Sequence, residues 1–223
     1  MIEICDLEKR FSRRPILSSL SLTAAPGEVV LIVGRNGSGK TTLLRVMAGL
    51  TGFQAGSLTI AGCILPSDAI TLRRHIGFLS HQIQLYGDLT VAENMQFFNR
   101  LHGRRLSAAQ LDSLLDRVGL LMWRDEHVRH FSRGMLQRLD LARVHMAQPD
   151  VLLLDEPGTG LDDDGLAILS GILNEASGQG RVVLMTSHQD GQVKAVTRRL
   201  LLEKGSLHAL STHRAGKMSG DVG

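Results

Sequence analysis

The chain has 223 residues, of which 43% are hydrophobic and 21% charged, and its 25 basic and 22 acidic side chains give a net charge of +3. This composition excludes a disordered, collagen-like or coiled-coil protein and fits one domain with a sizeable core. The longest aliphatic run, 29–33, is much shorter than the roughly 20 residues needed to cross a bilayer. The first residues also lack the pattern of a secretory signal. We therefore expect no direct membrane insertion.

Short apolar runs alternate with helical periodicity along the chain. The runs predict strands at 2–7, 20–24, 29–33, 57–60, 76–79, 151–154, 181–186 and 200–203. Apolar residues at helical spacing predict helices at 40–50, 91–102, 107–118, 133–147 and 162–176. Two of these helices are expected to begin with a capping box, formed by Thr90 with Glu93 and by Ser107 with Gln110.

The alternation of strands and helices predicts an α/β protein with a mostly parallel sheet and crossover helices. The uninterrupted helical block at 84–147 does not fit this alternation. We therefore expect a helical subdomain inserted into an α/β core that consists of 1–83 and 148–210. The polar, glycine-containing tail 211–223 is expected to fray.

A glycine-rich segment between the expected strand 29–33 and helix 40–50 fits the pattern G-x-x-x-x-G-K-[ST]. The candidate phosphate-binding residues are Gly34, Arg35, Asn36, Gly37, Ser38, Gly39, Lys40, Thr41 and Thr42. Glycines let the backbone wrap around phosphates, while N–H groups and the helix N-terminus supply partial positive charge. Lys40 adds a full charge near the β- and γ-phosphates, and the Thr41 hydroxyl can bind Mg²⁺. The alternative is a plain glycine-rich turn, but the strand-to-helix context favours nucleotide binding.

Two carboxylates, Asp155 and Glu156, directly follow the apolar run 151–154. In open α/β sheets, ligands bind outside the carboxyl ends of the strands. We expect Asp155 to hold Mg²⁺, mostly through water, and Glu156 to orient and polarise the attacking water. Two solvated acids at a strand end are the alternative, which is weakened by the phosphate-binding segment upstream.

Further segments resemble the motifs of ABC-type ATPases, in the order in which that family carries them. Ser132 and Gly134 lie in Phe-Ser-Arg-Gly-Met at 131–135, which resembles the family's signature segment. The other matches are Gln82 to the Q-loop, Asp162 to the D-loop, His188 to the H-loop and Phe11 to the adenine-stacking aromatic. The resemblance covers about residues 2–210. It implies a P-loop NTPase fold with an N-terminal antiparallel β portion, a mostly parallel core sheet and an inserted helical subdomain.

The resemblance implies an ATPase that binds ATP and Mg²⁺ and pairs with a second ATPase subunit, most simply an identical one. Each ATP would lie between the phosphate-binding segment of one subunit and Ser132 and Gly134 of the other. In this family arrangement His188 holds the γ-phosphate and the attacking water. Gln82 contacts Mg²⁺ or that water and moves with the helical subdomain, and Asp162 links the two sites.

The signature segment departs from the family's usual Leu-Ser-Gly-Gly-Gln, because Phe131, Arg133 and Met135 replace the leucine, the first glycine and the glutamine. The side chain of Met135 cannot donate a hydrogen bond. The contact across the dimer is therefore expected to be weaker, or to be partly replaced by Arg133. Phe11 stands where the family usually has tyrosine, a change that costs little for stacking on adenine.

Members of this family without spanning helices usually drive separate membrane subunits. The resemblance therefore implies transmembrane permease partners and a peripheral position on the cytoplasmic face of the inner membrane. The arginines are scattered, which argues against a nucleic-acid partner. Two distant cysteines favour a reducing compartment.

The string from His81 to Thr90, which includes Leu85, Tyr86 and Leu89, is similar to that of the haem-exporter ATPases of cytochrome c maturation. This similarity implies haem export. Three alternatives stay open: the ATPase of another exporter for a drug, a lipid or another substrate, a soluble ABC protein acting on DNA or ribosomes, and a regulatory subunit that hydrolyses ATP poorly. Leu85 and Tyr86 are expected either in the core of the helical subdomain or in a docking groove for a membrane partner.

Overall fold

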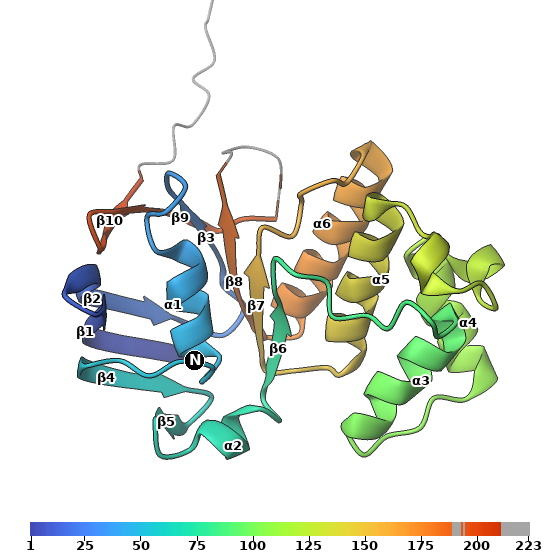
Figure 1. The fold of residues 1–223 in the computed structure, drawn as a ribbon, viewed down its shortest axis with the longest axis horizontal. Coiled ribbons are helices and arrows are strands. Elements are labelled where there is room, and N and C mark those ends of the chain that lie inside the picture. Colours follow the sequence, from blue (N-terminus) through green and yellow to red (C-terminus); the bar gives the residue numbers. More distant parts are fainter. Residues whose placement is uncertain (189–192, 194, 211–223) are drawn as a thin grey trace, which may run out of the picture.

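The computed structural model describes residues 1–188, 193 and 195–210 (Figure 1). The tail 211–223, which was expected to fray, lies outside the described residues. The strands are β1 (Ile2–Phe11), β2 (Arg14–Ala24), β3 (Val29–Val33), β4 (Ala55–Ile60), β5 (Cys63–Leu65), β6 (Ile76–Leu79), β7 (Val151–Asp155), β8 (Val182–Ser187), β9 (Arg198–Glu203) and β10 (Ser206–Ala209). The helices are α1 (Lys40–Met47), α2 (Ala69–Leu72), α3 (Val91–Leu101), α4 (Ala108–Arg117), α5 (Arg133–Met146) and α6 (Asp163–Gly178), with 3₁₀ helices η1 (Leu121–Trp123) and η2 (Val128–His130).

Two sheets form the α/β part of the molecule. The larger has the order β10-β9-β3-β8-β7-β6, and its strands are parallel except for β10, which is antiparallel to β9. The smaller sheet is antiparallel and has the order β2-β1-β4-β5. The expected α/β class, with a mostly parallel sheet and an N-terminal antiparallel portion, is confirmed.

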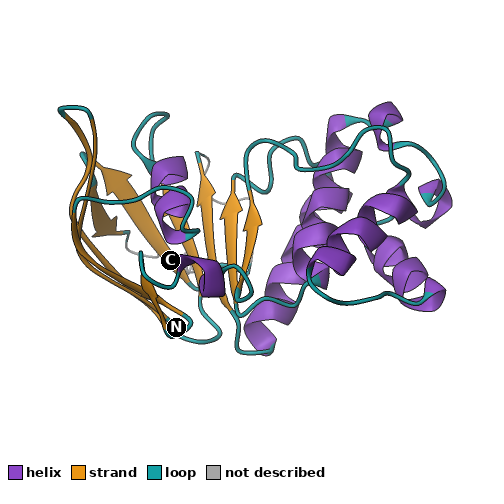
Figure 2. Ribbon diagram, turned by 60° about the horizontal axis from the view of Figure 1, so that its bottom comes forward, coloured by secondary structure: helices purple, strands orange, loops and turns teal. Residues whose placement is uncertain are grey.

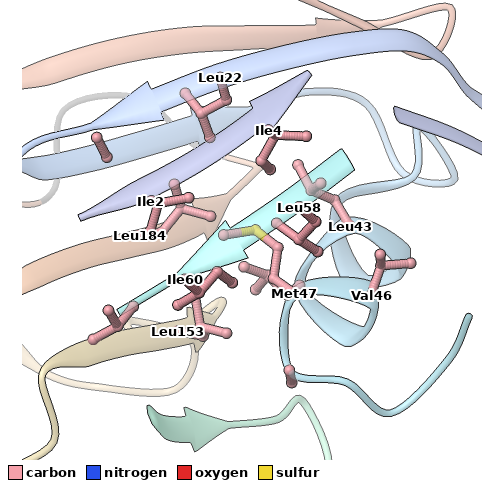
Figure 3. Close-up of a cluster of buried hydrophobic side chains, with 14 of the residues drawn as sticks. Ile2, Ile4, Leu22, Leu43, Val46, Met47, Leu58, Ile60, Leu153 and Leu184 are labelled. Carbon is pink, nitrogen blue, oxygen red and sulfur yellow. The ribbon is translucent and has the colours of Figure 1, made fainter. Parts of the chain in front are cut away.

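Helix α1 lies between the two sheets and buries its apolar face against both. Figure 3 shows this cluster, whose labelled members are Ile2, Ile4, Leu22, Leu43, Val46, Met47, Leu58, Ile60, Leu153 and Leu184. Along β3, residues 30 and 32 face this cluster, whereas 29, 31 and 33 face a second cluster formed with α5 and α6. Because both faces of the strand are covered, all five of its residues are apolar and buried.

Helices α3, α4 and α5 enclose a third hydrophobic cluster, and α3 to α6 lie together at one end of the molecule (Figure 2). Helix α5 serves two clusters, because Leu139 and Ala142 face the third cluster while Leu141 and Val144 face the sheet. Both expected capping boxes are present. The subdomain boundaries at 84 and 147 stay a prediction. In the part of the chain that the structure describes, no helix is both long and apolar enough to cross a membrane.

Several elements differ from the expected ones for local reasons. Strands β1 and β2 extend well beyond 2–7 and 20–24, because they continue as a hairpin whose pairing contains three register shifts. Each shift breaks the two-residue alternation by which a strand is found in a sequence. The elements β5, α2 and β10 were not expected, since three or four residues are too few to show a period.

Replacing Thr90 by alanine should lower the free energy of unfolding by about 1 kcal/mol, because the Glu93 N–H loses the side-chain acceptor that begins α3. Urea denaturation of the variant and the wild type measures this difference. Glu93→Gln is the matched control, since glutamine also completes a capping box and should change stability little. Equal stability of Thr90→Ala and wild type would contradict the assignment of this cap.

Candidate functional site

A cleft of about 380 Å³ lies at the carboxyl ends of β3 and β7. Its lining residues are Ile16, Asn36, Gly37, Gly39, Lys40, Thr41, Thr42, His81, Asp155 and Glu156. The glycine-rich segment and the two carboxylates, which are far apart in the sequence, therefore meet in one cavity. The other residues of the glycine-rich segment lie beside the cleft. Gly34 and Arg35 line a neighbouring shallow cavity with His188. The Ser38 hydroxyl is buried and has no hydrogen-bond partner among the described residues.

The glycine-rich loop leaves little room for side chains at two positions. A Cβ on Gly34 would lie 2.7 Å from the Leu202 carbonyl oxygen and 2.8 Å from Ser38 Oγ. Gly39 precedes α1 with a φ of 107°, a conformation that favours glycine. Lys40 is almost fully buried, and its Nζ donates to the Gly34 carbonyl at 2.7 Å. The ammonium group therefore closes the loop from inside, where phosphate oxygens can compete for its protons.

Asp155 is held rigidly beside Thr41. Its carboxylate is 2% exposed, and its Oδ2 accepts a hydrogen bond from Thr41 Oγ1 at 2.8 Å. Its Oδ1 accepts from Thr186 Oγ1 at 2.7 Å, and the same hydroxyl oxygen accepts from the Glu156 N–H at 3.1 Å. Two hard oxygen ligands, one of them anionic, thus lie side by side in the cleft, a donor set that fits Mg²⁺.

Thr186 is a residue of the site that the sequence analysis missed. It is fully buried and links Asp155 to the backbone of Glu156 through one hydroxyl group. Its only signal in the sequence is a hydroxyl residue after the apolar run 182–185.

Glu156 lines the cleft and is in contact with His188, which lines the neighbouring cavities. His188 Nδ1 is 3.2 Å from Glu156 Oε2, and Thr159 Oγ1 donates to the same oxygen at 3.4 Å. The backbone of Glu156 has a φ of 52°, in the left-handed region that non-glycine residues rarely adopt. Such strain persists only where the surroundings hold it, here through the Thr186 hydroxyl bonded to the Glu156 N–H.

Phe11 and Gln82, both expected at the site, also lie outside the lining of the cleft. Phe11 lies at the end of β1, half exposed, with its ring 4.7 Å from Lys9 Nζ. Gln82 is exposed in the loop after β6, and its neighbour His81 lines the cleft instead. The contacts of Phe11 with adenine and of Gln82 with Mg²⁺ or water stay predictions.

The signature segment and the expected D-loop lie side by side, and neither lines this chain's cleft. Ser132 caps α5 by accepting from the Met135 N–H at 3.3 Å, and Asp162 caps α6 by accepting from the Gly165 N–H at 2.8 Å. A Cβ on Gly134 would lie 3.0 Å from the Gly160 carbonyl oxygen, so the two segments approach closely.

The substituted signature residues have separate surroundings. Met135 packs against the third hydrophobic cluster, and Phe131 is buried in it with an edge contact to Trp123. Arg133 is exposed, but its aliphatic stem covers Gly160. Packing therefore accounts for Phe131 and Met135, whereas the guanidinium of Arg133 stays on the surface beside Ser132.

The ABC transporter family matches residues 17–159 of this chain. With the fold and the cleft described above, this match shows that the chain belongs to the ABC transporter family. It is an ABC-type ATPase, which hydrolyses ATP, and it is the ATP-binding subunit of an ABC transporter.

Curated relatives differ in their described substrates. The cytochrome c biogenesis ATP-binding export protein CcmA of Vibrio cholerae is 34% identical, covering 85% of this chain and 92% of its own length. The daunorubicin resistance ATP-binding protein DrrA3 of Streptomyces coeruleorubidus is 38% identical, and the match covers 83% of this chain and 60% of that protein. The Nod factor export ATP-binding protein I of Burkholderia lata is 34% identical, and the match covers 96% of this chain and 74% of that protein.

Solved structures share the fold. The ATP-binding subunit of an ABC transporter superposes with a TM-score of 0.86 at 27% identity, covering 94% of this chain and 88% of that one. The bacterial ABC transporter cassette MJ0796, solved as a dimer, has a TM-score of 0.82 at 23% identity, covering 93% and 96%.

Replacing Thr186 by valine should lower ATP turnover on the order of tenfold or more, because Asp155 and Glu156 lose the hydroxyl that positions both. Steady-state ATPase assays, with nucleotide affinity measured separately, test this. Thr197→Val is the matched control, since that hydroxyl also makes two bonds to one residue, Val29, at the opposite end of β3. Wild-type turnover in Thr186→Val, or an equal loss in Thr197→Val, would contradict the role of Thr186.

Proposed function

We propose that ATP binds in the cleft with its phosphates on the loop 34–41 and that Thr41 and Asp155 hold the accompanying Mg²⁺. The observation that carries this proposal is the convergence of Lys40, Thr41 and Asp155 in one cavity with Glu156. When bound, Mg²⁺ would neutralise charge that develops on the phosphate oxygens. Glu156 orients the attacking water and takes its proton, while His188 holds the γ-phosphate, so that the products are ADP and phosphate.

The catalytic site is completed by a second ATPase subunit, most simply an identical chain. Ser132 and Gly134 lie outside the cleft of their own chain, at the start of a helix with no acidic residue in its first turn. The positive end of this helix is therefore suited to a phosphate that another subunit presents. In this arrangement Asp162, which lies on the same surface, approaches the partner's site.

The membrane partner is a transmembrane permease, and the chain lies peripherally on the cytoplasmic face of the inner membrane. Tyr86 supports this proposal, because it is 52% exposed and its ring makes an edge contact with Phe97 and stacks on Phe98, with centroids 5.0 and 5.9 Å away. Leu85, in contrast, packs against the third cluster. Tyr86 therefore belongs to the proposed docking surface, and Leu85 belongs to the core of the helical part.

The transported substrate that we propose is haem, exported for cytochrome c biogenesis. Two observations support it: the similarity of the string 81–90 to the haem-exporter ATPases, and the 34% identity to the CcmA relative over 92% of that relative's length. Export of a drug is the second candidate, favoured by the 38% identity to the daunorubicin resistance protein.

Glu156→Gln should bind ATP normally, hydrolyse it at a small fraction of the wild-type rate and accumulate as a dimer, because closure no longer leads to product release. Size-exclusion chromatography with and without ATP measures the dimer. Adding Ser132→Arg should abolish the dimer without weakening ATP binding, since the added side chain fills the surface that meets the second subunit. Lys40→Ala is the control that should lose nucleotide affinity itself. Wild-type hydrolysis in Glu156→Gln would refute its role with the water.

Affinity purification of tagged Glu156→Gln from native membranes with ATP identifies the membrane partner. Recovery of small multi-spanning subunits together with cytochrome c maturation proteins is the expected result. Subunits of a drug exporter would overturn the haem proposal and leave the ATPase mechanism intact. Recovery of nucleic-acid or ribosomal components alone would overturn the permease proposal as well.

A further inference from the structure

A buried ion pair in α5 has no part in the ATP site described above. Asp140 is fully buried, and the side chain of Arg143 is 13% exposed. Arg143 Nε donates to Asp140 Oδ1 at 2.5 Å, one helical turn away. A buried ion pair of this kind adds little stability over a well-packed apolar pair. We therefore ask which backbone segments its two side chains hold in place.

Arg143 joins three elements that belong to different parts of the fold. From α5 its Nη2 donates to the Phe78 carbonyl oxygen in β6 at 3.3 Å. Its guanidinium carbon also lies 5.0 Å from the ring centroid of Phe98 in α3, an attractive contact between a cation and an aromatic face. The end of β6, just before the Gln82 loop, is thereby connected to α5 and α3.

Asp140 lies near the other side of the same loop. Burial raises the pKa of its carboxyl group, whereas the guanidinium of Arg143 and the nearby backbone N–H of Gln84 oppose this shift. Phe78 precedes Gln82 and Gln84 follows it, so the ion pair makes a hydrogen bond on one side of Gln82 and lies close to the backbone on the other.

The chain beyond Gln84 is fixed to the helices as well. Asn94 in α3 is fully buried and bonds to both backbone groups of Tyr86, accepting from its N–H at 2.9 Å and donating to its carbonyl at 2.9 Å. The exposed ring of Tyr86 packs on Phe97 and Phe98. A continuous set of contacts thus connects the Gln82 loop with the aromatic surface on α3.

We propose that Asp140 and Arg143 are a positioning pair, which holds the 78–84 segment to α3 and α5 so that Gln82 and the helices move as one body. This inference rests on the proposed role of Gln82 in the ATP site. Neither residue of the pair lines the cleft, so the pair acts through the loop. Its effect therefore belongs to turnover after ATP has bound.

The test replaces both charges by apolar side chains of similar size, Asp140→Leu with Arg143→Met, in the full chain. Such replacements are often neutral or stabilising, so the midpoint of thermal unfolding should be kept. We expect kcat to fall on the order of fivefold or more at unchanged nucleotide affinity, since the segment before Gln82 loses its hydrogen bond to Arg143. Asp140→Asn combined with Arg143→Met, which also removes both charges and keeps the shape of residue 140, gives the same comparison if the first double variant does not fold.

Two controls separate positioning from stability. Leu111→Ala removes a fully buried side chain from the third cluster away from the loop, and it should lower the unfolding midpoint while keeping kcat below that temperature. Gln82→Ala should lower kcat, and combining it with the double variant should cause no further loss.

Wild-type kcat in a folded charge-free variant, or losses that add to those of Gln82→Ala, would overturn the positioning role alone. Wild-type kcat in Gln82→Ala would instead refute the proposed role of Gln82, and this inference with it. Loss of nucleotide affinity in the charge-free variant would also overturn it, because the pair would then act on the cleft.

Discussion

The register between β7 and β8 sets the chemistry of the site, because it places Asp155 directly opposite Thr186. A slip by one residue would turn every side chain of β7 to the opposite face and remove Asp155 from the cleft. Parallel pairing also brings the carboxyl ends of β3, β7 and β8 to one edge of the sheet. The glycine-rich loop after β3, the carboxylates at the end of β7 and His188 after β8 therefore meet at this edge. No long-range polar contact has to guide them there.

Helix α5 joins this site to the helical part of the molecule. Alternate faces of the helix pack on the sheet and on the third cluster, and Ser132 stands at its first turn. The buried pair of Asp140 and Arg143 lies on the same helix. In the proposed dimer, a shift of α5 relative to β6 thus affects both the Gln82 loop and the surface that faces the second subunit, since α5 carries both the ion pair and Ser132.

The sequence was sufficient for the fold class, for the bounds of β3 and β6 and for the meeting of Lys40 with Asp155. These predictions rest on local sequence patterns, or on the rule that ligands bind at the carboxyl ends of parallel strands. Thr186 was missed because its role follows from pairing register, which one strand's sequence does not reveal. The placement of Phe11 and Gln82 outside the cleft was equally out of reach, since both lie in segments whose course depends on tertiary contacts. The family motif predicted their chemistry but not their orientation in a single chain.

The turn from Glu156 to Asp162 connects the two halves of the proposed dimeric site. Its first residue contacts His188, while Gly160 in its middle lies against Gly134 at the start of α5. Hydrogen bonds within the turn, from the Thr159 N–H to Glu156 and from the Leu161 N–H to Gly158, make it compact. In the proposed mechanism, a change at Glu156 when ATP becomes ADP would therefore be transmitted over a few residues to the surface that faces the second subunit. In the proposed dimer, each hydrolysis site adjoins the surface that completes the other, so the two sites are mechanically coupled by a single short turn.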